Sequence, residues 1–94
     1  MGAFPPIDSA EFIRVVTDRM AGSVSMLPQI LKKQSQDLGI TGAVPPAKIE
    51  LLIKKTVEAV DYFSGREAAL AVRRQMKKTL KEMAPEYFRV KYMF

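Results

Sequence analysis

The sequence has 94 residues, the size of one compact domain, so a second independent core is excluded. Hydrophobic residues make up 48% of the chain and charged residues 27%, a balance typical of soluble globular proteins. Cys and His are absent, which excludes disulfides, thiolate and imidazole metal ligands, and catalytic pairs built on these residues. We therefore expect a single domain over residues 1–94 that is not an enzyme and holds no metal or cofactor.

The net charge of +5 is concentrated in the second half of the chain. Four basic and four acidic residues balance each other over residues 1–47, whereas eleven basic and six acidic residues occupy residues 48–94. Such local basic character is typical of a surface that faces phosphate or an acidic partner. Since no apolar run approaches the about 18 residues that cross a bilayer, we expect no membrane association and a cytoplasmic location.

The first predicted helix covers residues 9–21 and follows an extended arm over residues 1–7 that contains a Pro-Pro pair. Asp8 and Glu11 have the spacing of a capping box, and apolar residues then recur every three or four positions. Gly22 supplies the stop signal for this helix.

The middle of the chain contains two further predicted helices, separated by a connection rich in Gly and Pro. The first spans residues 26–38, with Pro28 in its first turn and Gly39 beyond its end. The second spans residues 46–63, begins at Pro46 and has the strongest helical periodicity in the protein. Because neither half of the chain is long enough to hold its own core, the connection lies within one domain.

The fourth predicted helix spans residues 65–83 and follows the third almost at once, so the two should form a tight hairpin or a sharp bend. Ser64 and Glu67 have the spacing of a second capping box at its start. The rings of Tyr62 and Phe63, just before the turn, are expected in the core.

An aromatic and basic tail follows over residues 85–94, where apolar and basic residues alternate at the period of a strand. A single strand in a helical chain has no partner within that chain. The tail is therefore either an irregular or short helical piece, or an extended segment that pairs with its copy in another chain. The predicted fold is an all-α compact bundle of about four helices with an extended or irregular C-terminal tail.

Basic residues on the fourth helix form the first candidate binding surface. Five cations share one broad face of this helix over about 12 Å, a length that matches a few phosphates. Two further cations lie in the tail. The candidate nucleic-acid-binding residues are Arg73, Arg74, Lys77, Lys78, Lys81, Arg89 and Lys91. The alternative is a solvated helix face whose lysines serve helix propensity and solubility.

Aromatic residues in the tail form the second candidate surface. Because they alternate with cations, their rings could stack on the bases of a single strand. The interpretation that we favour is that they close one end of the bundle or form a dimer contact. The candidate partner-interface residues are Tyr87, Phe88, Tyr92 and Phe94.

Three carboxylates, Glu50, Glu58 and Asp61, are scattered along the third predicted helix. Acids at such spacings are far more often solvated or salt-bridged than part of an acid and base pair or a metal site. We assign them no role.

From Val44 onward the chain resembles the C-terminal helical domain of tRNA-dihydrouridine synthases, over residues 44–90. The matching elements are Val44-Pro45, Asp61-Tyr62-Phe63-Ser64-Gly65, Arg73-Arg74-Gln75, and Pro85 followed by Arg89. The resemblance implies a tRNA-contacting helical module in which Arg73, Arg74 and Arg89 are the matching positions. Gln75 stands where the family has a histidine, and the sequence lacks the flavin-binding barrel with its catalytic cysteine, so no catalytic residue carries over.

Two functions follow from these patterns. The first is a small non-enzymatic binding module whose cations contact the phosphates of nucleic acid, RNA more than DNA. The second is a helical protein–protein interaction module, or a homodimeric adaptor, that uses the aromatic tail, with the cations solubilising the chain or meeting an acidic protein partner. Salt distinguishes them, because affinity for phosphates falls steeply with salt whereas an apolar dimer persists.

Overall fold

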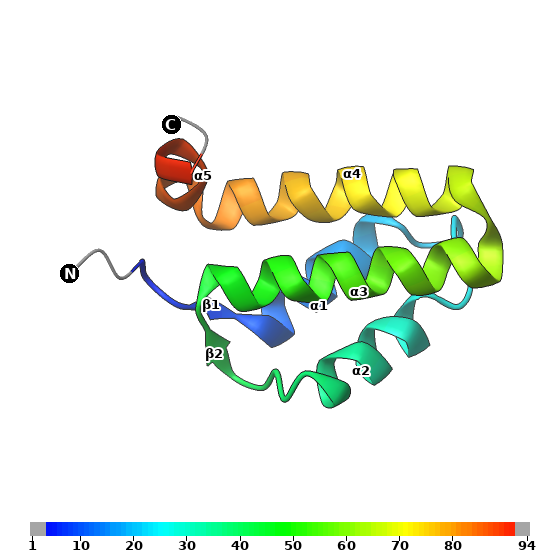
Figure 1. Ribbon diagram of the computed structural model, residues 1–94, viewed down its shortest axis with the longest axis horizontal. Helices are drawn as coiled ribbons and strands as arrows, with labels where there is room; N and C mark the ends of the chain where they lie inside the picture. Colours follow the sequence, from blue (N-terminus) through cyan, green and yellow to red (C-terminus); the bar gives the residue numbers. More distant parts are fainter. Residues whose placement is uncertain (1–3, 92–94) are drawn as a thin grey trace.

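The computed structural model describes residues 4–91, and within this range the chain forms five helices and one short strand pair (Figure 1). The helices are α1 (Ser9–Arg19), α2 (Leu27–Asp37), α3 (Pro46–Ser64), α4 (Arg66–Met83) and α5 (Pro85–Lys91). The strands are β1 (Ile7–Asp8) and β2 (Ala43–Val44), which pair antiparallel. The predicted all-α bundle is confirmed.

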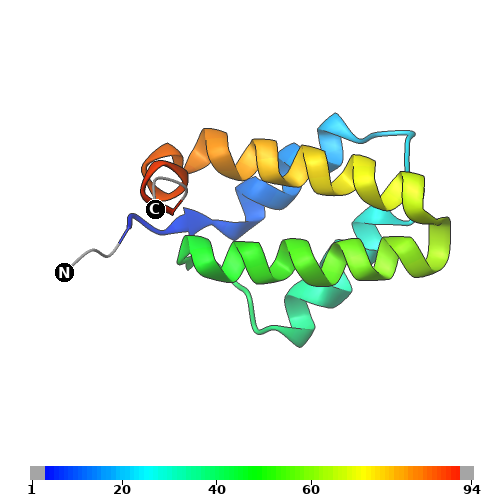
Figure 2. The ribbon, with the colours of Figure 1, turned by 45° about the horizontal axis from the view of Figure 1, so that its top comes forward.

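Helices α3 and α4 lie side by side and antiparallel, and they form the long axis of the molecule (Figures 1 and 2). Helix α2 runs beside α3 on the side away from α4, and α1 packs behind the pair against α4 in the view of Figure 1. Helix α5 folds back across the end of α4 (Figure 2). One face of the α3–α4 pair is therefore covered by α1 and α2, and the opposite face is turned outward.

The start of α1 follows the predicted pattern. Asp8 is the N-cap residue, and its side chain accepts hydrogen bonds from the backbone N–H groups of Ala10 at 3.0 Å and Glu11 at 3.4 Å. The last residue of the predicted arm is not free, because Ile7 pairs with Val44. This short pairing ties the N-terminal segment to the connection between α2 and α3.

The turn between α3 and α4 is made by Gly65 alone. This residue is both the C-cap of α3 and the N-cap of α4, with φ at +93° and ψ at 172°, a conformation that essentially only Gly adopts. The capping box expected from Ser64 and Glu67 is wrong, since Ser64 is still helical and no side chain caps α4. The turn is so tight that Gly65 takes the N-cap position itself.

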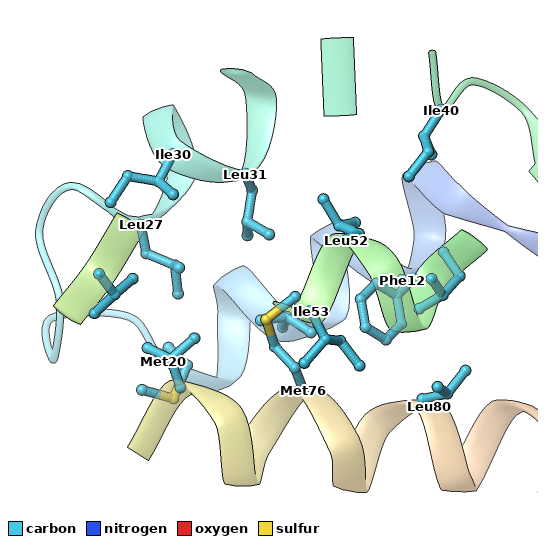
Figure 3. Packing of buried hydrophobic residues seen from close by; sticks show 14 of the residues in the cluster. Phe12, Met20, Leu27, Ile30, Leu31, Ile40, Leu52, Ile53, Met76 and Leu80 are labelled. Carbon is cyan, nitrogen blue, oxygen red and sulfur yellow. The ribbon is translucent and has the colours of Figure 1, made fainter. Parts of the chain in front are cut away.

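The core lies between α1, α2, α3 and α4, where side chains from all four helices converge (Figure 3). In Figure 3, Ile53 of α3 and Met76 of α4 lie between the two helices, and Phe12 of α1 packs beside them. Such burial supplies the main favourable contribution to folding. The fully buried residues with the largest side chains are Phe12, Leu27, Leu31, Ile49, Leu52, Met76 and Leu80.

The prediction that Tyr62 and Phe63 belong to the core is wrong. Their exposed fractions are 83% and 58%, and their rings pack edge to face on each other with centroids 5.0 Å apart. The reason is position, because both residues follow Val60, the last fully buried residue of α3, and lie beyond the core.

The C-terminal tail is a helix over Pro85–Lys91, which confirms the short helical piece among the alternatives, whereas an extended or irregular tail and a strand are wrong there. Pro85 begins the helix, where its missing N–H costs nothing. A helix also brings the adjacent rings of Tyr87 and Phe88 to the core together, whereas a strand would turn them to opposite faces. Tyr92 and Phe94 lie outside the described residues.

The packing of α3 makes a direct test of this core. Leu52 is fully buried and Leu51, the next residue on the same helix, is 38% exposed. We expect Leu52→Ala to lower the free energy of unfolding by about 2–5 kcal/mol, because it leaves a cavity. Leu51→Ala should lower it by less than about 1 kcal/mol. Urea unfolding of both variants checks this, and equal losses would contradict the orientation of α3.

Candidate functional site

The residues of α4 face three surroundings, namely the core, helix α1 and the outside of the bundle. Val72, Met76 and Leu80 are buried in the core, and Gln75 and Thr79 face α1. The remaining sides of the helix carry the cations. The core and α1 therefore fix the rotation of α4, and this rotation decides where the cations lie.

Arg19, the last residue of α1, holds α1 and α4 together. Its Nη1 donates hydrogen bonds to Gln75 Oε1 at 3.3 Å and Thr79 Oγ1 at 3.2 Å. Its Nη2 lies 2.6 Å from Glu82 Oε1, and this hydrogen bond lowers the pKa of the Glu82 carboxyl below its ordinary value. Glu82 is thus directed to α1, on the opposite side of α4 from Arg73 and Lys77.

Five cations of α4 form what we call the basic face, namely Arg73, Arg74, Lys77, Lys78 and Lys81. Lys77 is half-buried and the other four are exposed. Within the part of the chain that the structure describes, none of the five lies within 4.0 Å of an acidic group. Most other arginines are paired, for example Arg14 with Glu11 at 2.7 Å. Among the described residues, the basic face is therefore a set of positive charges without ion pairs, in which Lys78 lies near enough to Glu82 to help lower the pKa of that carboxyl.

The basic face has two parts that differ in their neighbours. Arg73 and Lys77 lie at the border of a groove between α3 and α4, which we call the α3–α4 groove. Arg74, Lys78 and Lys81 do not line this groove and point outward from the helix. A long anionic chain could reach all five, whereas a ligand in the groove would reach two.

Of the two candidate cations on α5, Arg89 is the one whose side chain the structure describes. Arg89 is exposed and forms an ion pair with Glu86, one turn earlier on the same helix. Lys91 is the last residue of α5. Arg89 therefore continues the series of cations beyond the end of α4 in sequence, with its charge engaged by Glu86.

The rings of Tyr87 and Phe88 are half-buried and pack against the core. Tyr87 also lies edge to face with Phe4 at 5.2 Å and donates a hydrogen bond to Glu50 Oε1. These contacts fasten α5 to α3 and to the N-terminal segment, so the two rings are not open stacking platforms. The exposed aromatic pair in the described range is Tyr62 and Phe63, at the other end of α3.

Sequence reasoning identified the cations of α4 but not the interactions that orient them. Arg19 had no local signal, because its partners are on a helix far along the chain. The α3–α4 groove also arises from two separate segments. A charged residue in the last turn of α1 and a polar pair in α4 could have suggested a contact, but not its geometry.

Comparison with known proteins finds no matching family model, no matching curated protein and no matching solved structure. Within residues 4–91, no helix combines the length and the apolar character needed to cross a membrane. In the same range no three acidic side chains gather in a group that could hold a metal ion. The function is therefore inferred from the geometry of α4 and its neighbours.

The contact between Arg19 and Glu82 makes stability depend on pH. Because the folded pKa of Glu82 is lowered from 4.5, its contribution to stability is present above that value and is lost as pH falls through the folded pKa. We expect Arg19→Gln to return the pKa of Glu82 toward 4.5 and to remove this part of the pH dependence. NMR titration of the carboxyl and urea unfolding at several pH values measure both effects.

Arg14→Gln is the matched control, since Arg14 pairs with Glu11 and Asp18 inside α1 and does not reach α4. It should leave the pKa of Glu82 unchanged. An unaltered Glu82 titration in Arg19→Gln would show that Arg19 does not hold this carboxylate.

Proposed function

We propose that the chain is a non-enzymatic binding module whose basic face, with Arg89 and Lys91 of α5, binds the phosphates of nucleic acid, RNA in preference to DNA. The observation that supports this proposal most is that the five cations of the basic face have no acidic partner among the described residues. A set of uncompensated cations on one helix attracts a polyanion, and each phosphate contact releases counterions.

The two acids of α4 neutralise little of the positive charge of the basic face. This helix carries two acids, Glu67 and Glu82. Glu82 is held by Arg19. Glu67 lies in the first turn of α4, about 9 Å along the helix axis from Arg73 at 1.5 Å per residue. Glu67 therefore lies away from the cations, whereas Glu82 lies one turn after Lys78 and is shared between that lysine and Arg19.

The outward part of the basic face has a regular spacing. Arg74, Lys78 and Lys81 follow one another by about one helical turn, or roughly 5 Å along the axis. Such a row can contact successive phosphates of one strand. Contacts of this kind position a nucleic acid without reading its bases, so we expect little sequence preference.

The preference for RNA is supported by the resemblance to the C-terminal domain of tRNA-dihydrouridine synthases, in which Arg73, Arg74 and Arg89 match the family pattern. Arg73 and Arg74 belong to the basic face, and Arg89 is exposed on α5. The ion pair of Arg89 with Glu86 is on the surface, where such pairs contribute little. Arg89 can therefore exchange its partner for a phosphate.

A second function, protein–protein interaction, is favoured by the rings of Tyr62 and Phe63. An aromatic side chain with an exposed fraction of 83% is unusual, and exposed aromatics are frequent anchors of protein interfaces. The neighbouring charges are mixed, since Glu58 and Asp61 lie beside Lys55 and Arg66, which is typical of the polar rim of a protein interface. Here the chain would act as a helical interaction module.

Replacing the outward cations tests the first function. We expect the triple variant Arg74→Gln, Lys78→Gln and Lys81→Gln to weaken binding of a fluorescein-labelled single-stranded RNA at low salt, measured by fluorescence anisotropy. Because about three phosphate contacts are lost, the slope of log K against log salt should become shallower by about 2.

The control variant carries Lys32→Gln, Lys33→Gln and Lys55→Gln on α2 and α3, and has the same net charge. We expect it to retain most of the affinity, because only a diffuse contribution of net charge is lost. Equal loss in both triple variants would show that binding follows net charge and not the basic face. No measurable binding of the unmodified chain to RNA or DNA at low salt would reject the proposal.

The double variant Tyr62→Ser and Phe63→Ser separates the two functions. On the nucleic-acid proposal it should bind the same RNA as tightly as the unmodified chain, because the pair lies away from the basic face. A loss of RNA affinity comparable to that of the α4 triple variant would instead place the site at the α3–α4 turn. Both measurements use the same anisotropy assay.

A further inference from the structure

The α3–α4 groove is a hollow of about 530 Å³ on the face of the α3–α4 pair that α1 and α2 do not cover. Its lining comes from α3, α4 and α5, with no residue of α1 or α2. At the turn end, Asp61 Oδ2 and Arg66 Nε lie 3.9 Å apart. At the opposite end, Phe88 of α5 contributes an aromatic wall. A volume of this size is in the range of small-molecule sites, about 300–1,000 Å³.

The groove has an apolar lining along its length. Ile53 and Val57 of α3 contribute from one side, and Leu70 and Leu80 of α4 from the other. Leu70, in the second turn of α4, has an exposed fraction of 44%. Ile53 and Leu80 are already buried, so a ligand body of carbon atoms would remove mainly the exposed parts of Val57 and Leu70 from water.

The acids that line the groove have partners, whereas three of its cations form no ion pair within the described part of the chain. All three acids have partners, since Glu50 accepts from Tyr87, Glu58 lies 4.0 Å from Lys55, and Asp61 is paired with Arg66. The other cations of the lining are Lys54, Arg73 and Lys77. None of these three has an acidic group within 4.0 Å among residues 4–91. The unmet electrostatic requirement of the groove is therefore for an anion.

The unpaired cations lie on both α3 and α4, at nearly the same position along the helix axes. Asp61 and Arg66 face each other across antiparallel helices, so a residue seven positions before Asp61 lies level with one seven positions after Arg66. These residues are Lys54 and Arg73. Lys77 follows Arg73 by one turn. Three donors thus border one section of the groove.

We propose that the α3–α4 groove binds a small anionic amphiphile, a molecule with a carboxylate, sulfonate or phosphate head and an aryl or short alkyl body. Lys54, Arg73 and Lys77 hold the head by charge-assisted hydrogen bonds. The body lies along Val57 and Leu70. A nucleic-acid strand does not fit this site, because its successive phosphates would meet the acids of α3 and leave the apolar lining uncovered.

Two fluorescent probes test whether the groove requires an anionic head. They are 8-anilinonaphthalene-1-sulfonate and N-phenyl-1-naphthylamine, which share the aryl body and differ by the sulfonate. We expect the folded chain to bind the sulfonate with a rise in fluorescence and to bind the neutral analogue at least about tenfold more weakly. Equal affinity for the two probes would overturn the proposal, because the cations would then contribute nothing.

A pair of variants with equal charge locates the site. We expect Lys54→Gln with Arg73→Gln to weaken sulfonate binding at least about tenfold. Arg74→Gln with Lys78→Gln, on the outward part of the basic face, should retain sulfonate binding while it loses RNA affinity. The second pair makes the two proposals distinguishable, because it removes only cations outside the groove, whereas the first pair also removes Arg73 of the basic face. Equal loss of sulfonate binding in both pairs would overturn the groove proposal.

An amide NMR titration of the unmodified chain with the sulfonate gives a second measurement that does not depend on any variant. We expect the largest shifts at residues around Val57, Leu70 and Arg73. Shifts confined to the α3–α4 turn near Tyr62 and Phe63 would overturn the proposal and would assign the probe to those exposed rings.

Discussion

The antiparallel packing of α3 against α4 across Gly65 is the constraint on which the rest of the structure depends. A single residue with φ at +93° ends one helix and begins the next, so the two helices run back along each other without a loop. Their buried faces then meet through residues such as Ile53 and Met76 (Figure 3). Because the buried side of α4 is fixed in this way, the cations of α4 lie on the other sides of the helix.

The distribution of acids follows from the same packing. Arg19 holds Glu82 on the α1 side of α4. On α3, Glu58 lies 4.0 Å from Lys55, and Asp61 lies 3.9 Å from Arg66. The five cations of the basic face and Lys54 of α3 therefore lie without an acidic group within 4.0 Å among the described residues, partly outward and partly along the α3–α4 groove. On our two proposals, the outward cations of α4 contact phosphates and the cations beside the groove hold a single anionic head group.

Local signals predicted the helices well, because apolar periodicity, Pro starts and Gly stops act within a few residues. The helices over 9–21, 26–38, 46–63 and 65–83 correspond closely to α1 through α4. Features that depend on distant neighbours were not predictable in this way. Tyr62 and Phe63 match the helical pattern of a core, but no other element covers them. The alternation in the tail suggested a strand, yet packing of Tyr87 and Phe88 on the bundle favours a helix.

The central claim is that the uncompensated cations of α4 are the surface that meets nucleic acid. The most direct measurement is an amide NMR titration of the isotope-labelled chain with an unlabelled uridine oligonucleotide at low and then at moderate salt. The account predicts shifts concentrated between Arg73 and Lys81, with reversal as salt displaces the phosphates. Shifts centred on Tyr62 and Phe63, or an absence of shifts at low salt, would contradict it.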